Sequence, residues 1–213
     1  TMLSRFTQAA RLKEVVSEDR TLLGCLAFHS PECEDQRAKE LMVDVFELLI
    51  QHGVDPGQVD KHGCLPLHYA CLHRNTKLIQ LLLEHMKMTS KADWLEARDS
   101  QGRTPLSAYF WNYKMLASER DETLQLLLSS GASVNSLAPC KHLSVLDCGF
   151  APRFLDRHFL EPALPDQVST SPLMIAITHG DVAMVRQLLD NNASLTLADS
   201  RGWTPAMYAV KAV

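Results

Sequence analysis

The residues of this chain that could carry chemistry are its cysteines and histidines. Two loose groups have side chains of the kind that bind zinc, namely Cys25, His29 and Cys33, and Cys140, His142 and Cys148. Zinc sites are usually built from CxxC-like pairs and need four ligands, whereas Pro31 interrupts the first group and neither group has an evident fourth ligand. Buried free cysteine is the common alternative, so we expect no metal.

Catalytic motifs are absent from the sequence as well. The chain has no GxSxG, HExxH, P-loop or GxGxxG segment, so neither an activated nucleophile nor a phosphate cradle is indicated. His68 lies near Cys71 and His73, which is where a catalytic histidine would be sought. We expect a protein that is not an enzyme and that uses no cofactor.

Length and composition indicate a folded chain. Its 213 residues are 46% hydrophobic, enough for one or two cores, and a net charge of −4 gives no general attraction to nucleic acid or anionic membranes. No apolar run is long enough to span a bilayer, and residues 1–11 lack the apolar core of a signal peptide. We expect a soluble intracellular protein, cytoplasmic or nuclear, with free thiols and no nucleic-acid partner.

Residues 171–210 contain the start of one structural unit twice. Ser171-Pro172-Leu173 corresponds to Thr204-Pro205-Ala206, and the two prolines are 33 residues apart. Proline suits the first turn of a helix, and the preceding Ser or Thr can act as its N-cap. A short apolar segment that Gly180 ends and an apolar stripe over residues 182–189 then predict two antiparallel helices. Neither helix can bury its apolar side alone, so the unit needs neighbours.

This pattern resembles the ankyrin repeat, a β-turn followed by two antiparallel helices with a TPLH-like start. Residues 60–70 reproduce DxxGxTPLHxA apart from Leu65, and residues 99–106 repeat the same start. The resemblance implies an all-α solenoid of helix-turn-helix units with β-turn or hairpin loops and several insertions. It also implies that His68 hydrogen-bonds within its turn and does not take part in catalysis.

We expect a single ankyrin-repeat domain over residues 1–213. Its parts are an N-terminal cap helix at 1–20, units at 21–59, 60–98, 99–135 and 171–198, a degenerate unit at 136–170 and an incomplete unit at 199–213. An excess centred on residues 30–35 is either an acidic loop or an early start of the second helix. An excess at 86–97 is expected to lengthen a hairpin between units. The proline-rich residues 136–170 are either a degenerate unit, with a second helix near 154–160, or one long excursion.

The resemblance implies which residues meet a partner, because hairpin tips and the exposed side of the first helices form a concave face. The candidate contacts are Lys61, His62, Tyr69, His73, Arg103, Trp111, Asn112, His179, Arg201 and Trp203. Aromatic and basic side chains are concentrated at the centres of protein interfaces, which favours Tyr69, His73, Arg103 and Trp111. Alternatively, Trp111 packs beneath the insertion that follows it.

The resemblance therefore implies a non-catalytic module that binds another protein or a peptide. An alternative is a regulatory or substrate-recruiting segment of a larger enzyme, with further domains of the same polypeptide beyond Val213, because the last unit stops after its first helix. A third possibility is a scaffold that self-associates through the uncovered side of that helix.

Overall fold

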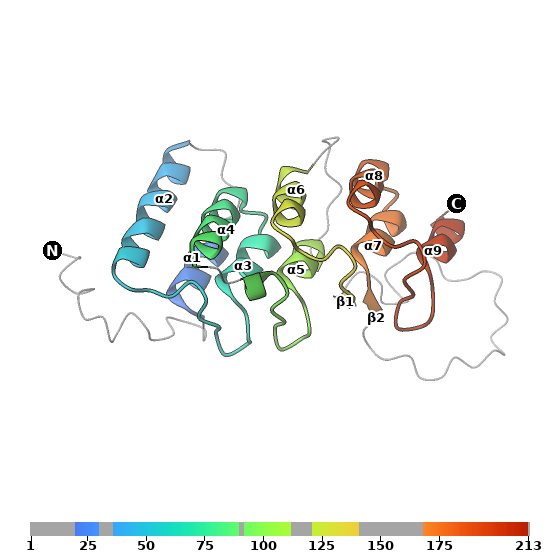
Figure 1. The fold of residues 1–213 in the computed structure, drawn as a ribbon, viewed down its shortest axis with the longest axis horizontal. Helices are drawn as coiled ribbons and strands as arrows, with labels where there is room; N and C mark the ends of the chain where they lie inside the picture. The colour runs from blue at the N-terminus through green and yellow to red at the C-terminus, as the bar shows by residue number, and fades with distance from the viewer. Residues whose placement is uncertain (1–19, 30–35, 90–91, 112–120, 141–167, 213) are drawn as a thin grey trace. The chain divides into compact units, whose positions relative to one another are not determined.

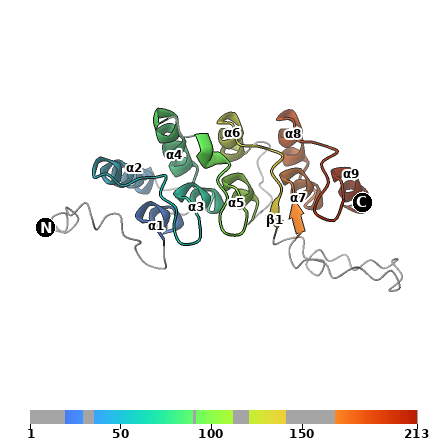
Figure 2. The same ribbon diagram turned by 60° about the horizontal axis from the view of Figure 1, so that its bottom comes forward.

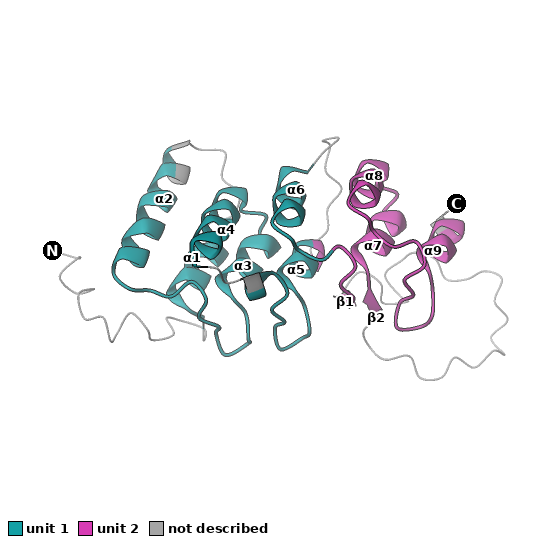
Figure 3. Cartoon of the chain, in the orientation of Figure 1, with its two compact units in different colours: residues 1–109, 121–133 teal, residues 110–120, 134–213 magenta. Residues whose placement is uncertain are grey.

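A computed structural model describes residues 20–29, 36–89, 92–111, 121–140 and 168–212 (Figure 1). The chain divides into two compact units, which Figure 3 shows in different colours. The first unit comprises residues 1–109 and 121–133, and the second comprises residues 110–120 and 134–213.

Paired helices make up the first unit. Its elements are α1 (Leu22–His29), α2 (Gln36–Gln51), α3 (Pro66–Leu72), α4 (Thr76–Thr89), the 3-10 helix η2 (Ala92–Leu95), α5 (Pro105–Trp111) and α6 (Glu122–Ser129), with the last two residues of α5 assigned to the second unit. Helix α3 packs against α1 and α4, and α4 also packs against α2 and α6 (Figure 2). The expected all-α arrangement of helix pairs is confirmed.

The second unit contains three helices and a small sheet among its described residues. Its elements are β1 (Ala138–Cys140), β2 (Val168–Thr170), α7 (Pro172–Thr178), α8 (Val182–Asp190) and α9 (Pro205–Ala212). Helix α7 packs against both α8 and α9. The strands are antiparallel, with Ala138 opposite Thr170 and Cys140 opposite Val168, so the two ends of the segment 136–170 lie together.

Four of the described first helices begin with proline, as the sequence predicts, whereas α1 begins at Leu22. Pro66, Pro105, Pro172 and Pro205 are the first residues of α3, α5, α7 and α9. The hydroxyl of Ser171 accepts a hydrogen bond from the backbone N–H of Met174 at 3.4 Å and so acts as the expected N-cap.

The second helices have N-caps of their own. The side chains of Asn75, Asp121 and Asp181 accept hydrogen bonds at 2.9–3.0 Å from the backbone N–H three residues later. Gly180 ends α7 with a φ of 67°, as predicted, and the corresponding residue after α3 is Arg74, with a φ of 53°. An arginine in this left-handed conformation was not predicted, because glycine ordinarily occupies such positions.

The core lies between the helices of each unit. Fully buried side chains in the first unit include Leu67, Leu78, Ile79, Leu82, Leu83, Leu106, Tyr109, Leu124 and Leu127, and in the second unit they include Leu173, Met174 and Leu188. Burying one such side chain stabilises a fold by roughly 1.5–3 kcal/mol. Residues Pro66 to Cys71 of the short helix α3 are all buried, so the stability of this helix depends on the neighbouring helices.

The insertions differ in structure. Residues 86–97 extend α4 to Thr89 and form η2, so a longer helix takes up part of the expected hairpin extension. Helix α2 begins at Gln36, well before the apolar stripe that starts at Val43, which favours the early helix start over a loop alone. Residues 30–35 themselves, all but the last residue of the cap helix expected at 1–20, and the second helix expected near 154–160 lie outside the described residues.

None of the helices in the described ranges combines the length and apolar character that a bilayer crossing needs.

Candidate functional site

A buried aspartate organises three of the hairpin tips, those that precede α3, α5 and α9. Its carboxylate accepts hydrogen bonds at 2.8–2.9 Å from the backbone N–H groups two and four residues later. A glycine three residues after it has a positive φ, which closes the turn. The aspartates are Asp60 and Asp99 in the first unit and Asp199 in the second, and the glycines are Gly63, Gly102 and Gly202. The tip backbone is therefore fixed by bonds encoded within five residues.

Hydrogen bonds also join each tip to its neighbour within a unit. In the first unit the backbone N–H of Ser100 donates to the carbonyl oxygen of His62 at 2.8 Å. In the second unit the backbone N–H of Ser200 donates to the carbonyl oxygen of Ser169 at 3.1 Å, and the hydroxyl of Ser200 accepts from the N–H of Ser169 at 3.1 Å. In the first unit these two bonded tips form a strip that exposes Lys61, His62, Ser100 and Gln101, and the tip of the second unit exposes Ser200.

Tyr69, an expected partner contact, is a core residue. Its side chain is only 7% exposed, and its hydroxyl donates to Asp60 Oδ2 at 2.6 Å. Phe28 of α1 meets the ring edge-on at 6.1 Å, and the Arg20 guanidinium lies over the same ring at 5.4 Å. Burial and the bond to Asp60 raise the pKa of the hydroxyl. A partner contact would require an accessible ring, so Tyr69 supports its hairpin tip instead of meeting a partner.

The histidines at the ends of first helices are half-buried. His73 follows α3 and meets the ring of Phe28 edge-on, with the ring centres 4.9 Å apart. His179 follows α7, and its Nδ1 lies 2.8 Å from the carbonyl oxygen of Ile175, to which it donates in the matching tautomer. Both rings thus contribute to the ends of their helices, and a part of each remains accessible.

Arg103 is held within its own turn. Its Nε and Nη2 donate to Asp99 Oδ2 at 2.7 and 2.6 Å. Burial by itself would raise the pKa of Asp99, but the hydrogen bonds from Arg103 outweigh burial and hold that pKa below its usual range. The guanidinium is half-buried and fixes the tip, so it is less available to a partner than the sequence predicted.

Arg201 and Trp203 form a basic aromatic cluster in the second unit. Arg201 Nη2 donates to Asp199 Oδ2 at 3.0 Å and to the hydroxyl oxygen of Tyr208 at 2.6 Å. The Trp203 ring lies near two cations, with the Arg201 guanidinium 5.1 Å and the Lys211 ammonium 4.9 Å from its centre. Both distances are within the range of cation–π attraction, and the ring stays partly exposed.

The other two expected contacts lie at the end of α5. Trp111 is half-buried, whereas Asn112 and the insertion that would cover Trp111 lie outside the described residues.

Sequence reasoning missed Arg20 and Phe28, whose guanidinium and ring are stacked 3.7 Å apart. Their pairing is a contact across residues eight apart that no repeat motif specifies.

The buried cysteines Cys64 and Cys71 are not poised as nucleophiles. Cys25, Cys64 and Cys71 are free thiols, and burial raises the pKa of Cys64 to about 11 and that of Cys71 further. Both stay protonated near neutral pH, so they are not poised to attack. Across the described ranges, no three His, Cys, Asp or Glu side chains are grouped closely enough to hold a metal ion.

His68 has the structural role that the resemblance implies. Its Nδ1 accepts a hydrogen bond from the backbone N–H of Leu65, the residue just before α3, at 3.1 Å. Its Nε2 lies 3.1 Å from the carbonyl oxygens of both Ala97 and Arg103, to which it donates. Burial disfavours the charged ring and lowers the pKa of His68 from its usual 6.5. A second proton would also have to sit on Nδ1, which faces the N–H of Leu65.

Mild acid is therefore expected to destabilise the folded chain through His68. Because the unfolded chain takes up this proton at a higher pH, the stabilisation is complete above about pH 6.5 and is lost as the pH falls below that value, with a slope of at most about 1.4 kcal/mol per pH unit. Urea unfolding at a series of pH values measures the slope. The variant His68→Gln, less stable at every pH, should show a shallower slope; an equal slope in both proteins would contradict the assignment.

Comparison with known proteins places the chain in a family. The family model described as ankyrin repeats in three copies matches residues 37–138 and 140–212. The chain is 27% identical over 172 residues to the B-cell lymphoma 3 protein homolog of Mus musculus, covering 78% of this chain and 37% of that protein. It is 25% identical over 157 residues to the probable 26S proteasome regulatory subunit p28 of Saccharomyces cerevisiae, covering 72% and 67%.

A solved structure has the same fold. The ankyrin repeat domain of Bcl-3, a member of the IkappaB protein family, aligns with a TM-score of 0.61 and 23% identity over 98% of this chain and 72% of that one. The chain spans little more than a third of the length of its B-cell lymphoma 3 relatives, with 37% of the mouse and 36% of the human protein covered. Because the family model covers most of its length and its helix pairs and turns follow the repeat, this chain belongs to the ankyrin-repeat family.

Proposed function

We propose that this chain is a non-catalytic module that binds another protein or a peptide through its hairpin tips and the first helices beside them. The observation that carries the proposal is the hydrogen-bonded strip of tips, in which the N–H of Ser100 bonds to the carbonyl of His62. Exposed side chains extend from this strip, whose backbone is already ordered in the free protein. Ankyrin-repeat relatives, one of them named as a proteasome regulatory subunit, support a protein partner.

The physical advantage of such a strip is preorganisation. Association costs free energy when loops and side chains become ordered, and a surface that is ordered beforehand avoids part of this cost. The aspartates at 60 and 99 each fix two backbone N–H groups of their tip in the free protein. A small set of contacts can then give useful affinity.

We propose His62 and Gln101 as contacts in the first unit and Trp203 in the second. His62 and Gln101 are exposed at neighbouring tips, and Trp203 offers a partly exposed ring beside two cations. Aromatic rings of this kind often contribute most to binding because they bury a large area and have few rotatable bonds. Tyr69, Asp99 and Arg103 stabilise the tips through the hydrogen bonds from Tyr69 to Asp60 and from Arg103 to Asp99.

Capture of a partner tests this proposal. The variant His62→Ala/Gln101→Ala should lose a protein that the parent captures from cell lysate, with affinity roughly tenfold weaker once that protein is purified. Its melting temperature should stay unchanged, since both side chains are exposed. The control Glu122→Ala/Gln125→Ala changes two exposed residues of α6 and should retain capture. Equal loss in both variants, or capture unaffected by the tip variant, would contradict the tip surface.

We also propose that residues 1–213 act as one ankyrin domain inside the cell, in the cytoplasm or nucleus. The family model matches parts of both compact units, which supports a single domain. Cys25, Cys64 and Cys71 are free thiols, as is usual for proteins of reducing compartments.

A further inference from the structure

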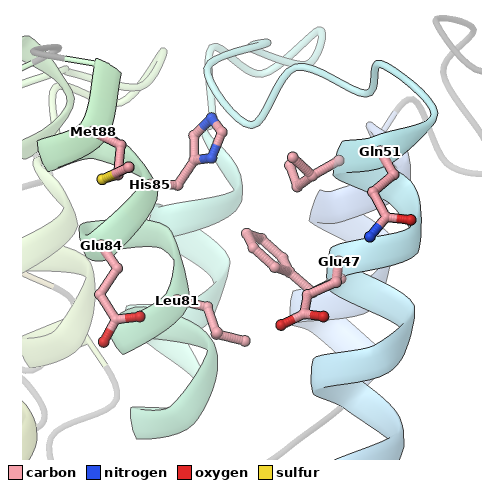
Figure 4. A pocket seen from close by; sticks show the side chains of 8 residues that line it. Glu47, Gln51, Leu81, Glu84, His85 and Met88 are labelled. Carbon is pink, nitrogen blue, oxygen red and sulfur yellow. The ribbon is translucent and has the colours of Figure 1, made fainter.

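A groove lies between the second helices α2 and α4 of the first unit (Figure 4). Phe46 and Ile50 of α2 and Leu81 and Met88 of α4 give it an apolar lining, and its volume is about 300 Å³. This volume is at the lower end of the range for ligand pockets and suits one or two large side chains better than a cofactor. The groove is formed by second helices, so it is separate from the hairpin tips of the first unit.

The lining of the groove combines a buried aromatic side chain with an exposed, flexible one at its edge. Phe46 is only 5% exposed, whereas Met88 is 86% exposed. A methionine left in water at the edge of an apolar groove can repack around an incoming side chain, because it is unbranched and polarisable. Leaving this apolar side chain in water is unfavourable, and contact with an apolar partner would remove its surface from water.

Carboxylates stand on both walls of this groove. Glu47 belongs to α2 and Glu84 to α4, both are exposed, and Figure 4 shows the Glu47 side chain projecting into the space between the helices. The Gln80 amide donates to Glu84 Oε1 at 2.9 Å, which leaves the second carboxylate oxygen available as an acceptor. None of the described residues that line the groove is lysine or arginine. The rim therefore favours cations over anions.

The insertion after α4 fixes one side of the groove. His85, which lines it, stacks on Trp94 of η2 with ring centres 6.4 Å apart and an angle of 14° between the planes. Trp94 is 7% exposed, and its ring packs against Gly57. The extra residues 86–97 thus contribute Met88 to the lining and support His85 through Trp94.

We propose that the α2–α4 groove binds a basic amphipathic segment of another protein. One large apolar side chain of that segment lies between Phe46, Leu81 and Met88, and its Lys or Arg side chains pair with Glu47 and Glu84. The two carboxylates select the charge of the partner, and the apolar lining supplies most of the contact area.

A synthetic peptide of leucine and lysine with helical spacing is the probe, and the same peptide with glutamate for lysine is its control. Fluorescence anisotropy of the labelled lysine peptide should show binding to the full chain, weakened by added salt and absent for the glutamate peptide. Glu47→Gln/Glu84→Gln should weaken binding roughly tenfold, and Met88→Ala should weaken it without a change in salt dependence. All three side chains are exposed, so the fold should be retained.

A matched variant distinguishes the effect of the groove carboxylates on peptide binding from the effect of the net charge of the chain. Glu122→Gln/Asp190→Asn also removes two exposed carboxylates, outside the groove, and should bind the lysine peptide like the parent. Hydrogen exchange should slow in α2 and α4 when the peptide is bound. Equal weakening by both charge variants, protection at the tips instead, no binding, or self-association of the chain through the same groove would each overturn the proposal.

Discussion

Replacing Tyr69 by alanine is expected to destabilise the first unit strongly instead of weakening partner binding alone. The substitution removes a ring that is 7% exposed and leaves Asp60 without the hydroxyl that donates to it at 2.6 Å. Loss of a buried aromatic side chain costs roughly 3–5 kcal/mol, because the cavity collapses only in part. Urea unfolding followed by circular dichroism measures this loss.

Two further variants distinguish the contribution of the Tyr69 ring to stability from that of its hydroxyl. Tyr69→Phe keeps the ring and should cost about 1–3 kcal/mol through the buried carboxylate oxygen that loses its donor. His62→Ala changes an exposed residue of the same tip and should stay within about 0.5 kcal/mol of the parent. Unchanged stability of Tyr69→Ala together with lost partner capture would show that the ring is a contact after all.

The second large effect is expected for Trp94, the residue by which the insertion docks onto the first unit. Its ring is 7% exposed, covers Gly57 and stacks on His85. Trp94→Ala is expected to lower the free energy of unfolding by roughly 3–5 kcal/mol. Thermal and urea unfolding both measure this change, and Val59→Ala, an exposed change near Gly57, serves as a control.

Gly57 provides a test of the same contact from its other side. A Cβ at this position would lie 2.6 Å from Trp94 Cζ2, so Gly57→Ala forces the ring to shift and should cost about 1–3 kcal/mol. In the Trp94→Ala background the added methyl group meets no ring, and Gly57→Ala should cost less than about 0.5 kcal/mol. Additive costs in the double variant would contradict direct packing of the two residues.

Sequence alone was sufficient for the repeat and for its turns. Proline at the start of a helix, Ser171 as an N-cap and Gly180 at the end of α7 all act through backbone dihedrals and hydrogen bonds within a few residues. His68 is a further example, since its bond to Leu65 lies within one turn. Such features repeat along the chain with the same spacing, so a single sequence displays them several times.

Sequence reasoning was less reliable for the surface. Tyr69 and Arg103 stand at positions that face a partner in the repeat pattern, yet each is engaged by an aspartate of its own tip. Burial of a side chain depends on the neighbouring unit as well as its own, here Phe28 of α1 against Tyr69. The position of a residue in the repeat therefore predicts where its side chain leaves the backbone. It does not predict whether that side chain remains accessible to a partner.

What the sequence determined by itself is the ankyrin family, the helix pairs and the fixed tips, because these follow from local propensities that recur with a period. Only the tertiary structure decided the burial of Tyr69, the docking of Trp94 on Gly57, the pairing of β1 with β2 and the groove between α2 and α4. Each of these joins residues far apart in the chain. Their contacts depend on side-chain shape and on how insertions return to the helices, which no repeat motif encodes.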